Sequence, residues 1–526
     1  MVRGSTWQVL ALGGLAGALY ALAFPPYGMV PLAALALLPL ILAVRRAPRA
    51  RVAVAAGAMA CLVASAFSFF WIADMAHRFW RVPWAFAGLL LGLFGTFAEI
   101  HFTLFALLAW KLRNRLAVWP AASTAALYTA LEIVVPKIFP DALGHSMVPL
   151  PVVPHASAWV GTYGLSFALA WCAAVLAWRS DRTRRSRTHR TLEMALCGLG
   201  FLVLCILGAL RQRAQASVAP ARSLEVLLVQ SNIGDPEELV ARLGNVTAAI
   251  DSVMTTYSNL TRQALAAGPV DLIVWPETAV PAVPRPRIVE RMSALARAIE
   301  TPIIFGGYDA VRAGDRFLMY NAAYHMTATG ELQARYYKHK LLVFSEYVPL
   351  SARFPWLLNL LPTPGEFTPG PGPRLFHAAG TAFSPLICYE LLFPRVVRRS
   401  LRAGGEVMLN LTNDYWFGRH AEPMQHLALS RMRAFETGRP VIRATNTGIS
   451  ALVDGQGRVL QRTGVWEQAV LRGTLPVPPP HWTPYARWGE WTTAAWIAAA
   501  LLAVSLSWRM LSRAEKVPAL VREESA

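Results

Sequence analysis

The feature that most constrains this chain is a series of apolar stretches, each long enough to cross a lipid bilayer. Seven precede residue 215 and an eighth lies near the end: 7–24, 29–44, 53–73, 84–110, 116–136, 157–178, 193–210 and 491–508. A helix needs about 20 apolar residues to span the hydrocarbon core. The first stretch follows a basic start, but AFPPYG is a poor cleavage site, so we interpret it as a retained anchor. The sequence therefore predicts a polytopic helical membrane domain with about eight spans.

Basic residues concentrate in the segments that follow the even-numbered stretches. RRAPRAR (45–51), KLRNR (111–115) and RSDRTRRSRTHR (179–190) follow the second, fourth and sixth stretches, and the tail after the eighth is also basic. By the positive-inside rule, both termini are cytoplasmic and residues 211–490 lie on the opposite side. The net charge of +19 then mainly reflects the basic segments that set the orientation of the chain in the membrane. We therefore predict no nucleic-acid partner.

Residues 222–475 differ from the rest because short β-type runs alternate with helical stretches. LEVLLVQSN (224–232) and TAFSPLICYE (381–390) are typical of buried strands. The pattern predicts an exported α/β sandwich of about 250 residues. The expected organisation is a transmembrane domain with seven spans at 1–215, the exported domain at 222–475, and a C-terminal segment at 476–526. That last segment contains a linker, the eighth span and a cytoplasmic tail.

The use of cysteine distinguishes the exported domain from the predicted spans. Four of the five cysteines fall inside spans, where a small buried thiol usually serves packing. Cys388, in LICYE, is the only cysteine of the exported domain and has no partner for a disulfide there. An unpaired thiol outside the cytoplasm is a liability unless it has a function. A nucleophilic thiol also needs a base or a nearby cation, since the thiolate is the reactive form.

Two further polar residues stand where β-type runs give way to loops. These are Glu277 in VWPET and Lys338 in YYKHKLLVFSEYVP. Taken singly, each is more often a surface charge. Together with Cys388 they form a consistent set, in which Glu277 takes the thiol proton and Lys338 stabilises the thiolate and an oxyanion. The backbone N–H of Tyr389 adds a second donor, whereas the adjacent Glu390 works against ionisation of the thiol.

The histidines of the exported domain do not show the spacing of a metal site. His420 and His426 have no cysteine near them, whereas zinc sites usually combine several closely spaced ligands. The chemistry of a thiol, a carboxylate and an ammonium needs neither a metal nor a histidine. We therefore expect a reaction that uses no metal and no other cofactor.

The order Glu–Lys–Cys, in the motifs VWPET, YxKxxLxxFxEYVP and ICYE, resembles the nitrilase superfamily. With the spans around that domain, nearly the whole chain resembles the apolipoprotein N-acyltransferases of bacterial inner membranes. The segments VQSNI, NLTNDYWFG and RAFETGRPVIRATNTGIS also match. The resemblance implies a nitrilase-like αββα sandwich in the periplasm, with Glu277 as base, Lys338 as oxyanion stabiliser and Cys388 as nucleophile. It also implies a supporting set: Glu346, Tyr389, Glu390, Asn413 and Trp416.

The resemblance further implies a reaction at the membrane surface. A fatty acyl chain moves from a membrane phospholipid to the N-terminal amine of a diacylglyceryl-cysteine apolipoprotein, through a thioester on Cys388 in a ping-pong scheme. This is the last step of lipoprotein maturation. The expected partners are the phospholipid donor, the apolipoprotein acceptor and the membrane. The expected enzyme is a monomer of the bacterial inner membrane.

Two other classes of function share parts of this pattern. A membrane-anchored amidase or nitrilase-type hydrolase uses the same three residues, but one span suffices for an anchor and seven precede the domain. A ligand-binding receptor or transporter leaves the three residues unexplained. Replacing Cys388 with Ala separates catalysis from binding, since only a catalyst needs the sulfur.

Three ionisable residues lie at membrane depth in the predicted spans. Glu99 and His101 are in the fourth stretch, and Glu132 is in the fifth. Such groups are costly in lipid and are often functional. We interpret these three as partners in hydrogen bonds between helices, an interpretation that requires other polar groups to face them.

Overall fold

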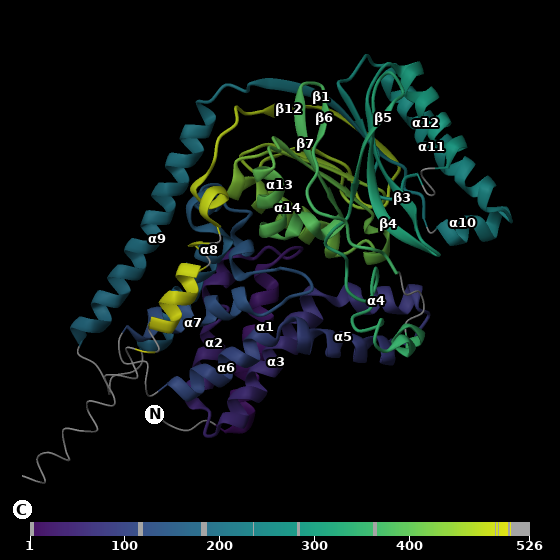
Figure 1. The fold of residues 1–526 in the computed structure, drawn as a ribbon. Helices are drawn as coiled ribbons and strands as arrows, with labels where there is room; N and C mark the ends of the chain where they lie inside the picture. Colours follow the sequence, from purple (N-terminus) through teal and green to yellow (C-terminus); the bar gives the residue numbers. More distant parts are fainter. Residues whose placement is uncertain are drawn as a thin grey trace, which may run out of the picture. The chain divides into compact units, whose positions relative to one another are not determined.

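The computed structural model divides into two compact units (Figure 1). It describes residues 5–113, 119–179, 187–234, 236–280, 285–360, 366–489, 491–492, 494–502 and 505. Unit 1 consists of Met1–His77, Val82–Arg213 and Pro484–Ala526, and unit 2 consists of Arg78–Arg81 and Ala214–Thr483. The short segment Arg78–Arg81 thus belongs to unit 2, although residues of unit 1 flank it on both sides in the sequence.

Unit 1 is built almost entirely from helices. They are α1 (Thr6–Ala23), α2 (Leu38–Arg46), α3 (Ala50–Ser68), α4 (Phe70–Phe79), α5 (Trp84–Ala98), α6 (Ile100–Leu112), α7 (Pro120–Val134), α8 (Ser157–Arg179) and α9 (Arg187–Ala216), with 3₁₀ turns η1 (Val30–Leu35), η2 (Leu143–Met147) and η3 (Val153–Ala156). Among the described residues, four helical segments are long and apolar enough to cross a membrane: Thr6–Ala23, Ala50–Ser68, Val153–Arg179 and Thr188–Ala216. The pair α5 and α6 passes the same test together, with a bend of 49°, which makes up to five.

Besides the bent pair in the stretch 84–110, two more of the eight predicted spans are not single helices of spanning length. The stretch at 29–44 is divided into η1 and α2 because Pro31 and Pro39 stand in the first turn of each, where a preceding helix cannot continue. The stretch at 116–136 contains α7, which has only 15 residues. The last stretch, 491–508, lies partly outside the described residues. Eight spans therefore stay a prediction.

Close packing in unit 1 depends on small residues. Gly13 and Gly17 of α1 face Ala56 and Ala60 of α3. A Cβ atom on Gly13 would lie 2.2 Å from the carbonyl oxygen of Ala56, so no larger residue fits there. Small residues four positions apart let two helix backbones approach closely, which is typical of helix pairs in membranes.

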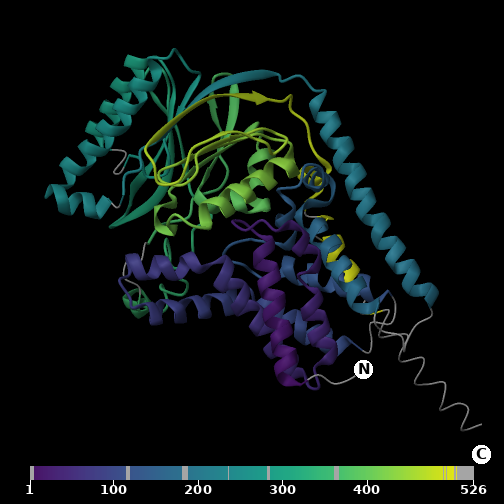
Figure 2. The same ribbon diagram turned by 180° about the vertical axis from the view of Figure 1, so that it is seen from behind.

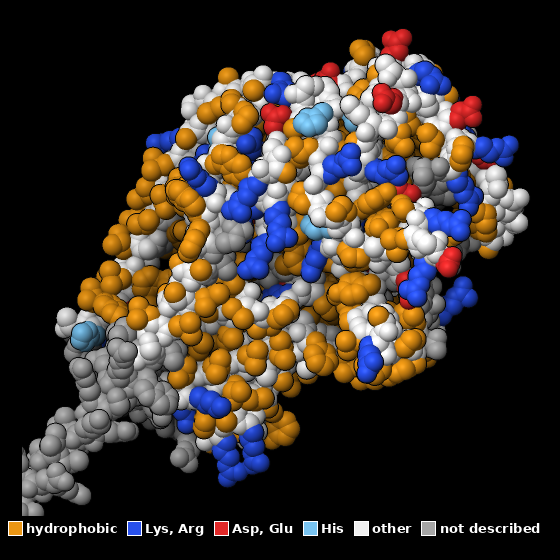
Figure 3. All heavy atoms as spheres, in the orientation of Figure 1, with side chains coloured by type: hydrophobic (Ala, Val, Ile, Leu, Met, Phe, Trp, Pro, Cys, Tyr) orange, Lys and Arg blue, Asp and Glu red, His pale blue; other side chains and the backbone are white. Residues whose placement is uncertain are grey.

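The outer side of α9 is apolar. Leu199, Leu202 and Ile206 are each about half exposed, and Figure 3 shows hydrophobic side chains along this helix. A continuous apolar surface of this length is unfavourable in water. The surface matches a helix that faces lipid, in agreement with the seventh predicted span.

Unit 2 contains two six-stranded sheets. Their strand orders are β12-β1-β2-β3-β4-β5 and β11-β10-β9-β8-β7-β6. The strands are β1 (Arg222–Gln230), β2 (Leu272–Val274), β3 (Ile303–Ala313), β4 (Arg316–Met326), β5 (Leu332–Tyr337), β6 (Phe376–Ala378), β7 (Thr381–Ile387), β8 (Val407–Thr412), β9 (Val441–Thr445), β10 (Ala451–Val453), β11 (Val459–Arg462) and β12 (Ala469–Val477). In each sheet three neighbouring strands are parallel, β1-β2-β3 and β7-β8-β9.

A helix layer covers the outer face of each sheet (Figure 1 and Figure 2). The helices are α10 (Pro236–Leu243), α11 (Val246–Leu265), α12 (Pro286–Ile299), α13 (Pro394–Arg402) and α14 (Glu422–Thr437). The first three share a core with one sheet, built around Trp275. The last two share a separate core with the other sheet. The inner faces of the sheets meet, since β4 contacts β7 and β1 contacts β9. The predicted αββα sandwich is therefore confirmed.

Candidate active site

Three side chains meet at strand ends in unit 2. Glu277 lies in the loop after β2, Lys338 directly follows β5, and Cys388 directly follows β7. All three are buried, with exposed fractions of 7%, 2% and 6%. The ammonium of Lys338 lies 3.6 Å from a carboxylate oxygen of Glu277, and the thiol of Cys388 interacts electrostatically with both groups. Residues separated by 111 positions in the sequence thus form one cluster.

Lys338 lies between two carboxylates. Its Nζ donates to Oε1 of Glu346 at 2.8 Å and is 3.6 Å from Oε1 of Glu277. Burial alone lowers the pKa of a lysine, but these two carboxylates outweigh burial and raise the pKa of Lys338 well above its usual range. Lys338 is therefore a permanent cation, which is the state that an oxyanion stabiliser needs.

Two hydrogen bonds hold the carboxylate of Glu277. The side-chain amide of Asn321 donates to Oε1 at 2.7 Å, and the backbone N–H of Asn413 donates to Oε2 at 2.9 Å. Asn321 also donates to Oε1 of Glu346 at 3.0 Å, so one amide bridges both carboxylates. Burial raises the pKa of Glu277, although Lys338 opposes the shift. A carboxylate with a raised pKa is a stronger general base.

Cys388 has a strained backbone. Its φ is 55°, in the left-handed region that residues with a side chain rarely adopt. The residue begins the 3₁₀ turn η5 (Cys388–Leu392) directly after β7, a sharp strand-to-helix turn that presents its side chain. Burial raises the pKa of the thiol well above its usual value, and Glu277 adds to the shift while Lys338 opposes it. The thiol is therefore protonated at rest, and a base must take its proton as attack begins.

Glu390 ties the segment that carries Lys338 to the turn that carries the thiol. One carboxylate oxygen accepts the backbone N–H groups of His339 and Lys340, both at 3.0 Å, and the other accepts the N–H of Ile387 at 2.8 Å. Burial acts to raise the pKa of Glu390, but His339 and the backbone donors lower it. Glu390 therefore stays charged and orients its neighbours. The sequence analysis had named Glu390 as a supporting residue and had indicated its effect on the thiol pKa, but not these hydrogen bonds.

The remaining expected residues are Tyr389 and Trp416. The ring of Tyr389 lies with its centroid 5.4 Å from Nζ of Lys338, and its hydroxyl donates to the carbonyl of Leu341. Trp416, in the 3₁₀ turn η6 (Asp414–Phe417), is 41% exposed. Its ring is 4.8 Å from that of Phe79, centroid to centroid. Trp416 thus lies partly exposed at the surface of unit 2.

Sequence reasoning missed two buried asparagines. Asn321 in β4 joins the two carboxylates, and Asn410 in β8 donates to the backbone carbonyls of Leu386 and Cys388. Both are buried, and a buried amide is nearly always hydrogen-bonded. The only available signal was a polar residue inside a β-type run, in NAAYHM and NLTND.

One group of side chains has a spacing that suits a metal ion. The ligand atoms of Asp414, Glu422 and His426 lie within 4.8 Å of one another. However, Arg443 pairs with one oxygen of Asp414 at 2.6 Å, and Thr412 donates to the other at 3.1 Å. A buried guanidinium already balances this carboxylate, which disfavours a second cation beside it. A reaction without a metal stays our prediction.

A second cluster of charged residues is buried in unit 1. Nζ of Lys137 lies 3.5 Å from Oε2 of Glu99 and 3.2 Å from Oδ1 of Asp141. Nδ1 of His101 is 3.3 Å from the same oxygen of Glu99. Glu132 in α7 accepts a backbone N–H from η2 at 2.7 Å. The structure thus places the three ionisable residues of the predicted spans among polar partners from neighbouring segments.

Comparison with known proteins covers both units. Residues 227–478 match the carbon-nitrogen hydrolase family, and residues 16–175 match the apolipoprotein N-acyltransferase N-terminal domain. The apolipoprotein N-acyltransferase of Geobacter metallireducens is 31% identical over 95% of each chain. This chain belongs to the apolipoprotein N-acyltransferase family. Members from Azotobacter vinelandii and Pseudomonas aeruginosa are 34% and 32% identical, over 98% and 96% of each chain.

Solved structures are similar to about half of the chain. A mutant of the amidase from Nesterenkonia sp. AN1, with acrylamide added at its active-site cysteine, is 19% identical. Its TM-score is 0.36 over 51% of this chain and 98% of that one. Nit3 from Saccharomyces cerevisiae, a member of branch 10 of the nitrilase superfamily, is 18% identical. Its TM-score is 0.38 over 52% of this chain and 95% of that one.

Proposed function

We propose that this protein transfers a fatty acyl chain from a membrane phospholipid to the N-terminal amine of a diacylglyceryl-cysteine apolipoprotein. One observation carries the proposal. A buried thiol on a strained turn, Cys388, interacts with the carboxylate of Glu277 and the ammonium of Lys338. The same chain contains helices long and apolar enough to cross a membrane. The full-length relationship to apolipoprotein N-acyltransferases supports it.

In the first half-reaction, the thiol of Cys388 attacks the ester carbonyl of the phospholipid. Glu277 accepts the thiol proton as the sulfur–carbon bond forms. Lys338 donates a hydrogen bond to the oxyanion of the tetrahedral intermediate, an interaction typically worth about 10²–10³-fold in rate. The intermediate collapses with release of the lysophospholipid, whose alkoxide takes the proton back from Glu277. The acyl chain is then a thioester on Cys388.

In the second half-reaction, the N-terminal amine of the apolipoprotein attacks the thioester carbonyl. Glu277 accepts a proton from the amine, and the same proton returns to the sulfur as the thiolate leaves. The product is an amide, and the thiol is restored. Water is a competing nucleophile throughout, so the low exposure of Cys388, 6%, favours transfer over hydrolysis.

Attachment to the membrane matters because of the acyl chain. Moving a sixteen-carbon chain into water costs on the order of 12 kcal/mol, taking about 0.8 kcal/mol per CH₂. An enzyme in the membrane leaves the chain in an apolar environment and brings only the ester to Cys388. Trp356, in the 3₁₀ turn η4 (Pro355–Leu360), is 58% exposed and suits an interfacial position.

For the topology we propose the arrangement that the basic loops favour. Eight spans place both termini in the cytoplasm and the catalytic residues 222–475 in the periplasm, where a phospholipid and an exported lipoprotein are both accessible. We propose that one chain suffices, because the catalytic residues all come from unit 2 of a single chain. Labelling of single engineered cysteines on either side of the membrane tests the orientation of each loop.

A transfer assay with two matched acceptors tests the function. Wild-type protein in detergent is given phosphatidylethanolamine with labelled acyl chains and a synthetic diacylglyceryl-cysteine peptide, with either a free or an acetylated N-terminus. We expect the label on the free-amine peptide only, as an amide. Release of the label as free fatty acid, with no label on either peptide, would instead identify a membrane-anchored hydrolase and contradict the proposal.

A further inference from the structure

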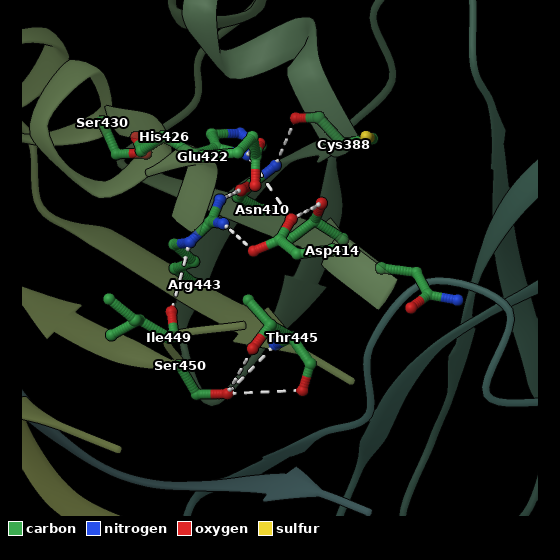
Figure 4. Close-up of polar contacts among 12 residues, drawn as sticks. Cys388, Asn410, Asp414, Glu422, His426, Ser430, Arg443, Thr445, Ile449 and Ser450 are labelled. Atoms are coloured by element: carbon green, nitrogen blue, oxygen red, sulfur yellow. Dashed lines mark hydrogen bonds and ion pairs between the residues drawn. The ribbon is translucent and has the colours of Figure 1, made fainter. Parts of the chain in front are cut away.

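A buried amide holds the strained backbone of Cys388. A residue with a side chain keeps a positive φ only where its surroundings hold it there. Asn410 lies in the neighbouring strand β8 and is fully buried. Its Nδ2 donates to the carbonyl oxygen of Leu386 at 3.0 Å. It also donates to the carbonyl oxygen of Cys388 at 2.9 Å (Figure 4). The amide thus joins the end of β7 to the first residue of the turn.

Arg443 sets the orientation of that amide. Its Nη1 donates to Oδ1 of Asn410 at 2.8 Å. A guanidinium has only donors, so it must face the amide oxygen, which leaves both amide hydrogens for the two carbonyls. The strand register makes this possible, because Leu386 pairs with Asn410 and Asn410 pairs with Arg443 across three parallel strands.

The same guanidinium forms a second set of hydrogen bonds. We call its contact with Asn410 the first arm and this second set the second arm. Its Nη2 donates to Oδ2 of Asp414 at 2.6 Å, and its Nε donates to the carbonyl of Ile449 at 3.2 Å (Figure 4). Asp414 directly follows Asn413, whose backbone N–H donates to Glu277 at 2.9 Å. Burial acts to raise the pKa of Asp414, but Arg443 helps to lower it to about 2, so the ion pair persists.

The second arm is tightly packed. A Cβ atom on Gly448 would lie 1.9 Å from Oδ2 of Asp414. Any side chain at position 448 would therefore push Asp414 away from Arg443. A substitution of Gly448 can therefore disturb the second arm while the charges of Arg443 and Asp414 both remain.

We propose that Arg443 is a positioning residue that aligns both partners of the proton transfer. One arm reaches the backbone of Cys388 through Asn410. The other reaches the carboxylate of Glu277 through Asp414 and the N–H that precedes it. Arg443 itself contacts no reacting atom. The inference rests on the proposed function, in which Cys388 is the nucleophile and Glu277 the base.

Two variants disturb the arms to different extents, because Asn410→Asp affects only the arm to Cys388 and Arg443→Lys affects both. Asn410→Asp keeps the size of the side chain and an acceptor for Arg443 but cannot donate to the two carbonyls. Arg443→Lys keeps a cation near Asp414, but one ammonium cannot replace three directed donors. We expect acylation of Cys388 by phospholipid to slow about 10²-fold in both, because a displacement of about 1 Å has that effect. The KM for phospholipid should not change.

The pH profile separates positioning from a structural role. The Asn413 N–H lowers the pKa of Glu277, so loosening its turn raises that pKa. The acid limb of the acylation rate should move to higher pH in Arg443→Lys and Gly448→Ala, and should stay in place in Asn410→Asp. Alkylation of Cys388 by iodoacetamide should slow in Asn410→Asp and Arg443→Lys. A merely structural role changes neither measurement in the folded protein.

A buried arginine elsewhere in unit 2 provides the control. Arg433 in α14 pairs with Glu436 at 3.1 Å, and Arg433→Lys should acylate and alkylate like wild type. Wild-type rates in folded Arg443→Lys and Asn410→Asp would overturn the inference. If Arg443→Lys does not fold, Asn410→Asp and Gly448→Ala decide the matter. If wild type forms no acyl-enzyme, the proposed function fails, while the alkylation rates still test the positioning role.

Discussion

Each unit of this protein buries a lysine between two carboxylates. Lys137 in unit 1 has carboxylate oxygens at 3.5 and 3.2 Å, and Lys338 in unit 2 has them at 3.6 and 2.8 Å. Both lysines are at most 5% exposed. In charge and burial the two clusters are nearly the same, so these properties do not explain why only one is suited to catalysis.

The difference lies in the cysteine beside each cluster. Cys61 is inside the regular helix α3, and its thiol donates to the backbone carbonyl of Glu99 at 2.9 Å. Cys388 stands at a strand end with φ 55°, where its thiol interacts with the side chains of Glu277 and Lys338. The comparison teaches that residue types alone do not make this site. In the proposed mechanism the site also needs the strained turn of Cys388, which holds the thiol where it interacts with Glu277 and Lys338.

The largest effect is expected when each cysteine is removed in turn. Cys388→Ala should reduce acyl transfer on the order of 10⁶-fold, as loss of a nucleophile typically does. Cys61→Ala should leave transfer within about twofold of wild type, since Cys61 packs inside α3 and its hydrogen bond to the backbone carbonyl of Glu99 lies outside unit 2. Transfer to a lipopeptide, measured per mole of folded protein, checks both. Equal losses in the two variants would show that the clusters do not differ as described.

Removing the lysines should separate catalysis from stability. Lys338→Met should lower kcat about 10²–10³-fold through loss of an oxyanion donor. Lys137→Met leaves two buried carboxylates without their cation and should cost about 3–5 kcal/mol of stability, while the fraction that stays folded keeps its kcat. Thermal unfolding in detergent and single-turnover acylation measure the two effects. A normal kcat in Lys338→Met would remove Lys338 from the mechanism.

A smaller effect is expected from the asparagine beside Glu277. Glu277 must be ionised to act as base, so activity is lost as pH falls through its raised pKa. Asn321→Ser removes a hydrogen bond that lowers this pKa, so the acid limb of kcat/KM should move to higher pH. The matched change in unit 1, Tyr20→Phe, removes a 2.6 Å bond to Asp141 and should leave the limb in place. If the acid limb of kcat/KM moves in neither variant, Glu277 is not the base.

The sequence pointed to the candidate cluster because each member stands where a β-type run ends and because the three motifs resemble one family. Glu277, Lys338 and Cys388 are polar residues in that position. The alternation of strands and helices indicated an α/β sandwich, and the resemblance to the nitrilase superfamily implied its αββα layers. Asn410 and Arg443 lie inside strands, where a polar residue gives no such signal. Their arrangement depends on the register of strands far apart in the sequence, which one sequence does not reveal.

The predicted spans show a different limit of prediction from the sequence. Hydropathy counts apolar residues over a window and does not register where a helix must begin again. Pro31 and Pro39 divide the second stretch into two short pieces. Glu99 lies at the junction where α5 and α6 bend by 49°, so one apolar stretch forms two helices. Composition thus predicted the membrane character of unit 1 better than the course of its helices.

The most direct test of the account is the mass of the peptide that contains Cys388, after brief incubation of the wild-type protein with phospholipid and an acid quench. We expect an added fatty acyl group on Cys388, removable by neutral hydroxylamine, in wild type and in Cys61→Ala. We expect no adduct in Glu277→Gln. A preparation that acylates the lipopeptide while Cys388 stays unmodified at every time point would contradict the account.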